Sequence, residues 1–79
     1  MKRVLILCTG NSCRSQMAEG WMRHLAGDRT EVYSAGTHPE SVNPYTIKVM
    51  QSSGVDISNY NSNIIDDYLD VTFDFIITV

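Results

Sequence analysis

The sequence predicts an α/β fold of three layers, in which a central parallel sheet carries helices on both faces. Three short apolar runs are typical of strands, and stretches with helical spacing separate them. Strands that alternate with helices in this way are joined by right-handed crossovers, so they lie parallel in the sheet. The chain has 79 residues and a formal net charge of −3, which predicts one small domain over residues 1–79.

The predicted strands are rich in apolar and β-branched side chains. Residues 3–7 form a continuous run without alternation, as expected of a strand that is covered on both faces. Residues 31–35 form a second strand, which Gly36 ends. The run VTFDFIITV at 71–79 ends in a solid apolar stretch, so a third buried strand is expected there.

The longest predicted helix covers residues 14–26 and stops at Gly27. Its apolar residues recur at helical spacing and are expected to lie in the core. These residues are Met17, Ala18, Trp21, Met22 and Leu25. We assign Trp21 no function beyond this packing.

Two shorter helices are predicted further along the chain. Asn43 can cap a helix, and Pro44 suits the first helical position, which predicts a helix over about 44–53. Ser62 is expected to cap a short helix. The apolar residues of that helix are Ile64, Ile65, Tyr68 and Leu69.

Composition and charge exclude several classes of function. The chain is mildly acidic and has neither a basic face nor a basic run, which argues against binding to nucleic acid or to an anionic membrane. No stretch reaches transmembrane length, and the apolar run at 4–7 is too short for a signal peptide. Two cysteines without a secretory signal fit a cytoplasmic protein, in which a cysteine is more often catalytic or inert than structural.

The segment ILCTGNSCRSQMAEG, residues 6–20, joins a strand to a helix, and ligands bind at this position in open α/β sheets. Gly10 and Asn11 tolerate left-handed backbone angles, so the chain can curl with its N–H groups inward and hold an anion. The start of the helix adds its positive dipole end, and Arg14 matches a tetrahedral oxyanion with two parallel donors. The predicted anion-binding residues are Thr9, Gly10, Asn11, Ser12, Cys13, Arg14 and Ser15.

Cys8 stands at the head of this loop, and its thiol has four possible roles. It can be a nucleophile, half of a disulfide, a metal ligand or a buried thiol without chemistry. The loop dipoles and the Ser15 hydroxyl would favour its thiolate, which would face the central atom of a bound anion as covalent displacement requires. The pattern Cys-X5-Arg-Ser between a strand and a helix therefore favours the nucleophile. Zinc is disfavoured because the two sulfurs have no partner pair, and the loop lacks the Gly-Lys-Ser/Thr of a Walker loop. Cys13 is either a packing residue or a reversible partner of Cys8.

The stretch CTGNSCRS resembles the phosphate-binding loop of the low-molecular-weight protein tyrosine phosphatases and of the thioredoxin-coupled arsenate reductases built on the same fold. The stretches CRSQMAEGW, VYSAG, VNP and DISN extend the resemblance over essentially the whole chain. The phosphatases usually have proline after the Arg-Ser pair. Gln16, followed by MAEGW, is similar to the reductase version.

The resemblance implies a role for each matching residue. Cys8 would attack arsenic, Arg14 would clamp the oxyanion, Ser15 would stabilise the thiolate, and Asn11 would hold the loop in shape. Some of these reductases bind a potassium ion behind the loop, and the matching positions here are Asn11, Glu19 and Ser34. Asn63 stands where a carboxylate is expected in that site. Apart from this role, Glu19 is expected to be a solvated charge on an exposed helix face. No tightly bound cofactor is implied, and the reductant is an external thiol.

The resemblance also implies parts that this chain does not contain. Family members are longer and carry in their C-terminal half a general-acid aspartate and, in the reductases, two further cysteines that form a disulfide for thioredoxin to reduce. We therefore expect a C-terminally incomplete domain with strand order 2-1-3, no fourth strand and an unpaired outer edge that invites self-association. We expect the 79 residues alone to be inactive or weakly active. Three functions are compatible with these residues: an arsenate reductase, a phosphatase acting on phosphate monoesters, or an inactive oxyanion-binding fragment.

Overall fold

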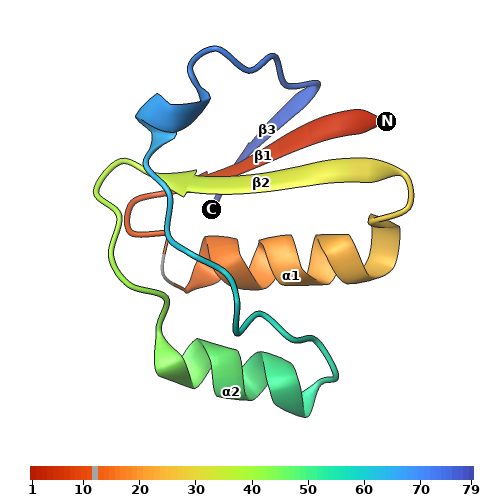
Figure 1. The fold of residues 1–79 in the computed structure, drawn as a ribbon, viewed down its shortest axis with the longest axis vertical. Coiled ribbons are helices and arrows are strands. Elements are labelled where there is room, and N and C mark those ends of the chain that lie inside the picture. The colour runs from red at the N-terminus through yellow and green to blue at the C-terminus, as the bar shows by residue number, and fades with distance from the viewer. Residues whose placement is uncertain (12) are drawn as a thin grey trace.

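The computed structural model describes residues 1–11 and 13–79, and Figure 1 shows the arrangement of its elements. They are β1 (Lys2–Cys8), α1 (Arg14–Ala26), β2 (Thr30–Gly36), α2 (Pro44–Ser52), the 3-10 helix η1 (Ile65–Tyr68) and β3 (Phe75–Thr78). The predicted bounds of α1 are confirmed, and β1, β2 and α2 agree with prediction to within one residue at each end.

The three strands form one parallel sheet in the order β2-β1-β3, which confirms the predicted order. The register pairs Cys8 with Gly36 and Leu7 with Thr78. The carboxyl ends of all three strands therefore meet at one edge of the sheet. The loop that leads into α1 begins at this edge, so the sheet places the candidate site there.

Helical segments lie on both faces of the sheet, as predicted (Figure 1). On one face, Ala18 and Met22 of α1 pack against a buried cluster formed by Val4, Ile6 and Val32. The other face is covered by η1 and the residues after it. There the ring of Tyr33 contacts those of Tyr68 and Phe73, at centroid distances of 5.4 and 5.5 Å.

Helix α2 packs on the outer side of α1 rather than on the sheet (Figure 1). A second buried cluster, Met50, Val55 and Ile57, fills the space between them. Gly20 allows this close approach, because a Cβ there would lie 2.8 Å from a methyl group of Ile57. Asn43 caps α2 as predicted, since its Oδ1 accepts a hydrogen bond from the Tyr45 N–H at 2.8 Å.

The core assignment for two residues of α1 is wrong. Trp21 and Leu25 are exposed, at 37% and 69%, while α1 buries Ser15, Gln16, Glu19 and Gly20. The buried polar residues bond to the loop and to β2, and this orientation turns the side that carries Trp21 and Leu25 outward.

Two predictions near the C-terminal end also need correction. Strand β3 is shorter than expected and exposed along its length, because among the described residues it pairs with β1 alone and forms an edge of the sheet. Ser62 does not cap η1, whose N-cap residue is Ile64 and which has no side-chain cap. The Ser62 hydroxyl instead donates to the carbonyl oxygen of Asn11 at 2.7 Å.

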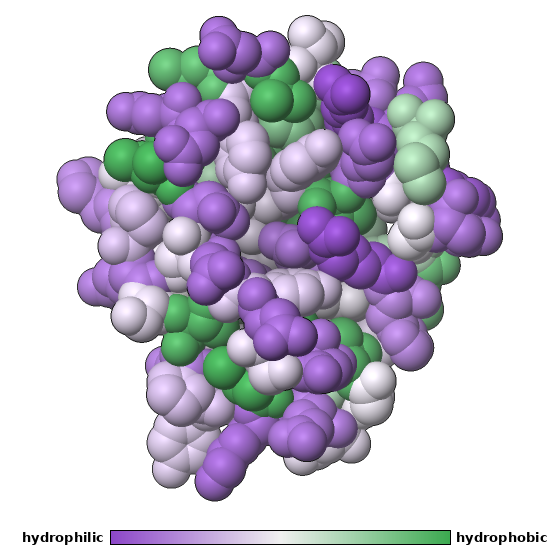
Figure 2. Space-filling model, in the orientation of Figure 1, coloured by the Kyte–Doolittle hydropathy of each residue, from purple (hydrophilic) through white to green (hydrophobic). Residues whose placement is uncertain are grey.

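The face seen in Figure 2 is mostly hydrophilic, with apolar side chains in small scattered groups. None of the helices formed by the described residues is both long and apolar enough to cross a bilayer.

Candidate active site

The candidate site is the loop between the end of β1 and the start of α1. Cys8 is the last residue of β1, and Arg14 is the first residue of α1. The first N–H groups of α1 have no partners within the helix and carry the positive end of its dipole. Cys8 is partly buried and Arg14 is exposed, so the thiol and the guanidinium stand at the mouth of one loop.

The sulfur of Cys8 has two polar contacts. The backbone N–H of Asn11 donates to Sγ at 3.0 Å, and the Ser15 hydroxyl lies 2.9 Å from the same atom. The Asn11 side chain donates to the Ser15 oxygen at 2.7 Å and so fixes the position of the hydroxyl beside the sulfur. These two contacts hold the sulfur at the head of the loop.

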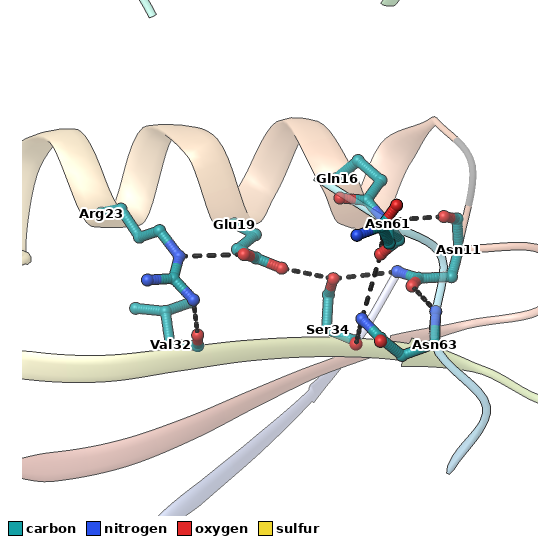
Figure 3. Close-up of polar contacts among 8 residues, drawn as sticks. All are labelled: Asn11, Gln16, Glu19, Arg23, Val32, Ser34, Asn61 and Asn63. Carbon is teal, nitrogen blue, oxygen red and sulfur yellow. Dashed lines mark hydrogen bonds and ion pairs between the residues drawn. The ribbon is translucent and has the colours of Figure 1, made fainter. Parts of the chain in front are cut away.

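Asn11 is the residue that fixes the shape of the loop. Its φ is 49°, in the left-handed region that asparagine tolerates better than most residues, and it is completely buried. Its Nδ2 donates to both Ser15 and Ser34, and its Oδ1 accepts from the backbone N–H of Asn63 at 2.7 Å. The side chain thus ties the loop to α1, to β2 and to residues 61–63 (Figure 3).

The carbonyl of Asn11 is held as firmly as its side chain. Gln16 Nε2 donates to it at 2.9 Å, and the Ser62 hydroxyl donates at 2.7 Å. Gln16 Nε2 also donates to the carbonyl of Asn61 at 3.1 Å, so one buried amide joins the loop to residues 61–63. Gln16 Oε1 is a buried atom without a hydrogen-bond partner in the part of the chain that the structure describes.

Behind the loop lies a buried carboxylate that the helical pattern had placed in solvent. Glu19 is 7% exposed, which corrects the expectation of a solvated charge. The Ser34 hydroxyl donates to its Oε1, and Arg23 Nε donates to its Oε2 at 2.9 Å. The helical spacing did not reveal this burial, because the Ser34 contact comes from β2, which is distant in sequence.

A cleft of about 320 Å³ opens above the loop. Its lining includes most of the residues predicted to bind an anion, namely Thr9, Gly10, Asn11, Cys13 and Arg14, together with Cys8. Ser15 is buried beneath the sulfur rather than in the cleft, and Ser12 lies outside the described residues. A hollow of about 530 Å³ beside residues 39–42 and 60–62 is larger, but neither Cys8 nor Arg14 lines it.

Two residues that follow β2 also belong to the cleft, and the sequence patterns did not reveal them. His38 and Glu40 line it. Their backbone N–H groups donate to the carbonyls of Thr9 and Gly10 at 2.9 and 2.8 Å. Gly36 permits this approach, because a Cβ there would lie 2.4 Å from the Thr9 carbonyl oxygen. That glycine, at the end of β2, was the one local signal of a close contact.

Cys13 lies on the exposed side of the loop, and both cysteines are free thiols. The Thr46 hydroxyl of α2 donates to the Cys13 sulfur at 3.1 Å. Among the residues that the structure describes, no three His, Cys, Asp or Glu side chains gather as a metal site would require. Cys13 is therefore a member of the loop that is anchored to α2.

Comparison with known proteins identifies the family. The family model of the low molecular weight phosphotyrosine protein phosphatases matches residues 3–79. The chain belongs to this family of enzymes. The resemblance and the phosphatase-like fold predicted from the loop are thereby confirmed.

The relatives within the family include arsenate reductases. Arsenate reductase 2 of Staphylococcus epidermidis is 47% identical over 78 residues, which cover 99% of this chain and 60% of that protein. The chain therefore spans about three-fifths of the length of this relative. Among solved structures, an arsenate reductase in the phosphate-binding state superposes with a TM-score of 0.93 at 38% identity, covering 100% of this chain and 60% of the other. A thioredoxin-dependent arsenate reductase of Corynebacterium glutamicum gives 0.91 at 33% identity, covering 99% and 40%.

We predict that replacing Asn11 destabilises the fold in two separable ways. Asn11→Gly keeps the left-handed backbone but removes the buried amide, and should lower the free energy of unfolding by about 1–3 kcal/mol. Asn11→Ala should cost about 1 kcal/mol more, because alanine also resists a positive φ. Urea denaturation measures both. Equal losses in the two variants would contradict a contribution from the backbone angle.

Proposed function

We propose that this chain forms the arsenate-binding, nucleophilic part of a thioredoxin-coupled arsenate reductase that acts in the cytoplasm. The observation that carries the proposal is the Cys8 sulfur, which the Asn11 N–H and the Ser15 hydroxyl both contact, at the head of a loop that opens beside Arg14. Family membership and the arsenate reductases among the relatives support the choice of arsenate.

In the first step, arsenate lies in the loop with its oxygens facing the backbone N–H groups and the start of α1. The Arg14 guanidinium holds two of those oxygens with parallel hydrogen bonds. The Cys8 thiolate attacks arsenic, a sulfur–arsenic bond forms, and one arsenic–oxygen bond breaks. The departing oxygen takes up protons and leaves as water. The aspartate that the family resemblance implies for this protonation is not among these 79 residues.

The second step reduces arsenic. A second thiolate attacks the Cys8 sulfur, and a disulfide forms. The electron pair of the sulfur–arsenic bond moves to arsenic, so arsenic(V) leaves as arsenite, arsenic(III). A reduced thioredoxin, the external thiol reductant, then returns the disulfide to thiols through a mixed disulfide. The resemblance assigns the further thiols to the C-terminal part of family members, so this chain supplies binding and attack.

Gln16 favours the reductase over the phosphatase. Its amide donates to the carbonyls of Asn11 and Asn61 and so fixes the back of the loop. A proline side chain, usual in the phosphatases at this position, has no donor and could make neither contact. The residue that separates the two subfamilies is thus one that shapes the anion site.

The same Cys8 and Arg14 could instead act on a phosphate monoester through a cysteinyl-phosphate. The family to which the chain belongs is that of phosphotyrosine protein phosphatases, which supports this alternative. Hydrolysis of p-nitrophenyl phosphate without any thiol reductant identifies that activity. Anion binding without either turnover identifies a binding fragment. Arsenite production that requires thioredoxin identifies the reductase.

The central prediction concerns alkylation of Cys8. Arsenate at saturation should slow modification of Cys8 by iodoacetamide at least about tenfold, because the anion covers the sulfur. Peptide mass spectrometry monitors Cys8, and the same protein treated without arsenate is the reference. We expect little or no turnover from the 79 residues themselves.

The variant Cys8→Ser should lose all covalent chemistry but should still bind arsenate, as measured by calorimetry. If arsenate does not change the rate of Cys8 alkylation, or if activity remains in Cys8→Ser, Cys8 is not the nucleophile.

Arg14→Lys should weaken arsenate binding about 10- to 100-fold, although the charge is kept, because an ammonium cannot form the two parallel bonds. The matched control is Arg29→Lys, which changes an exposed arginine beyond the other end of α1. Calorimetric titration with arsenate compares the two. If Arg14→Lys binds like the wild type, Arg14 does not clamp the anion bidentately.

We also propose that chains associate through the outer edge of β3. Its side chains are apolar and exposed, with Ile76 at 61%, and a strand edge offers unpaired backbone groups. Sedimentation should show a concentration-dependent dimer that Ile76→Lys removes. Val49→Lys, an equally drastic change on the exposed side of α2, should leave it intact. A monomer at all concentrations would refute the association.

A further inference from the structure

The resemblance to the reductases implies a potassium ion held by Asn11, Glu19 and Ser34. We propose instead that the guanidinium of Arg23 takes the place of that cation in this chain, so that the support of the loop needs no potassium. This inference is independent of the proposed function, because it concerns how the loop is held rather than what it binds.

Arg23 is anchored on three sides, although its side chain is half exposed. Its Nε donates to Glu19 at 2.9 Å, and a terminal nitrogen donates to the carbonyl of Val32 in β2. Its carbon Cζ lies over the ring of Tyr60, 5.8 Å from the centroid. Burial raises the pKa of Tyr60, and the charge of Glu19 raises it further, so this ring stays neutral beneath the guanidinium. An ordinary surface pair would not be held by a carbonyl of another element.

The residues matching the cation site do not present free oxygens to a metal. Asn11 directs its amide nitrogen toward Ser34, while its oxygen accepts from the backbone of Asn63 (Figure 3). The Ser34 hydroxyl accepts from Asn11 and donates to Glu19. Each Glu19 oxygen already has a donor. A hard cation prefers oxygen ligands, and here each of these oxygens already has a hydrogen-bond donor within the protein.

The charges around Glu19 also indicate that the site needs no potassium ion. Glu19 contributes one negative charge and Arg23 one positive charge, and Asn63 is neutral where the resemblance predicts a carboxylate. The pair is therefore balanced by itself. With a carboxylate at position 63, the site would hold one uncompensated negative charge and would require a cation.

Arg23 acts on the loop through other residues, so it is a positioning residue. A continuous path of hydrogen bonds runs from Arg23 through Glu19 and Ser34 to Asn11, which contacts the Cys8 sulfur through its backbone N–H. Figure 3 shows this path up to the Asn11 side chain. Loss of the guanidinium would leave a buried carboxylate uncompensated in the middle of the path.

The test is thermal unfolding in potassium chloride against choline chloride at equal ionic strength. The wild type should have the same midpoint in both salts. Arg23→Met should lose about 4–8 °C in choline and recover part of that loss as potassium is added. The matched control Arg29→Met, which removes an exposed arginine, should show neither effect.

A complementary variant keeps the test decisive if Arg23→Met does not fold. Asn63→Asp restores the implied carboxylate and should create a saturable, potassium-specific rise of the midpoint that sodium or lithium does not reproduce. A potassium-specific rise in the wild type would overturn the proposal. It would also be overturned if Arg23→Met matched Arg29→Met in both salts.

Discussion

The structure of the site depends on Asn11, a buried residue with a left-handed backbone. Such a backbone is unfavourable by about 1 kcal/mol or more, and it persists only where neighbouring groups enforce it. Here the N–H, the carbonyl and both ends of the side chain are all bonded. Four separate parts of the chain hold one residue, so the loop cannot relax without breaking bonds to all of them. The same constraint directs an N–H at the Cys8 sulfur.

This constraint explains why α1 is packed with its polar residues inward. A helix usually buries its apolar stripe, and the sequence has such a stripe through Trp21 and Leu25. The loop, however, needs the Ser15 hydroxyl and the Gln16 amide, and β2 needs a partner for Ser34. Buried polar groups that are fully hydrogen-bonded stabilise one unique arrangement. Buried polar groups without hydrogen-bond partners would instead lower the free energy of unfolding. The orientation of α1 is therefore set by this network together with Met17, Ala18 and Met22, which pack against the two buried clusters, while Trp21 and Leu25 stay outside.

The sequence allowed most of the fold to be predicted, because the strand and helix signals are local. The helix over 14–26, the Asn43 cap and the position of the loop between β1 and α1 all depend on a few adjacent residues. The errors share one cause, which is contact between distant segments. The burial of Glu19 depends on Ser34, and the place of His38 at the cleft depends on backbone bonds to the loop. The burial of Glu19 leaves no trace in the helical spacing, and the place of His38 is signalled only by Gly36. The exposure of β3 likewise depends on its position in the sheet rather than on its apolar sequence.

The support of the anion site and its chemistry can therefore be separated in this chain. The groups that shape the loop, Asn11, Gln16, Glu19 and Arg23, lie behind the sulfur, and none of them needs to touch an anion in order to act. Because they are already bonded, the donors of the loop are set before an anion arrives, and little ordering is left to oppose binding. A prearranged loop of this kind suits any tetrahedral oxyanion of similar size. Under the proposed function, discrimination between arsenate and a phosphate ester would then come from the fate of the covalent intermediate, since a sulfur–arsenic bond yields to a second thiol and a sulfur–phosphorus bond yields to water.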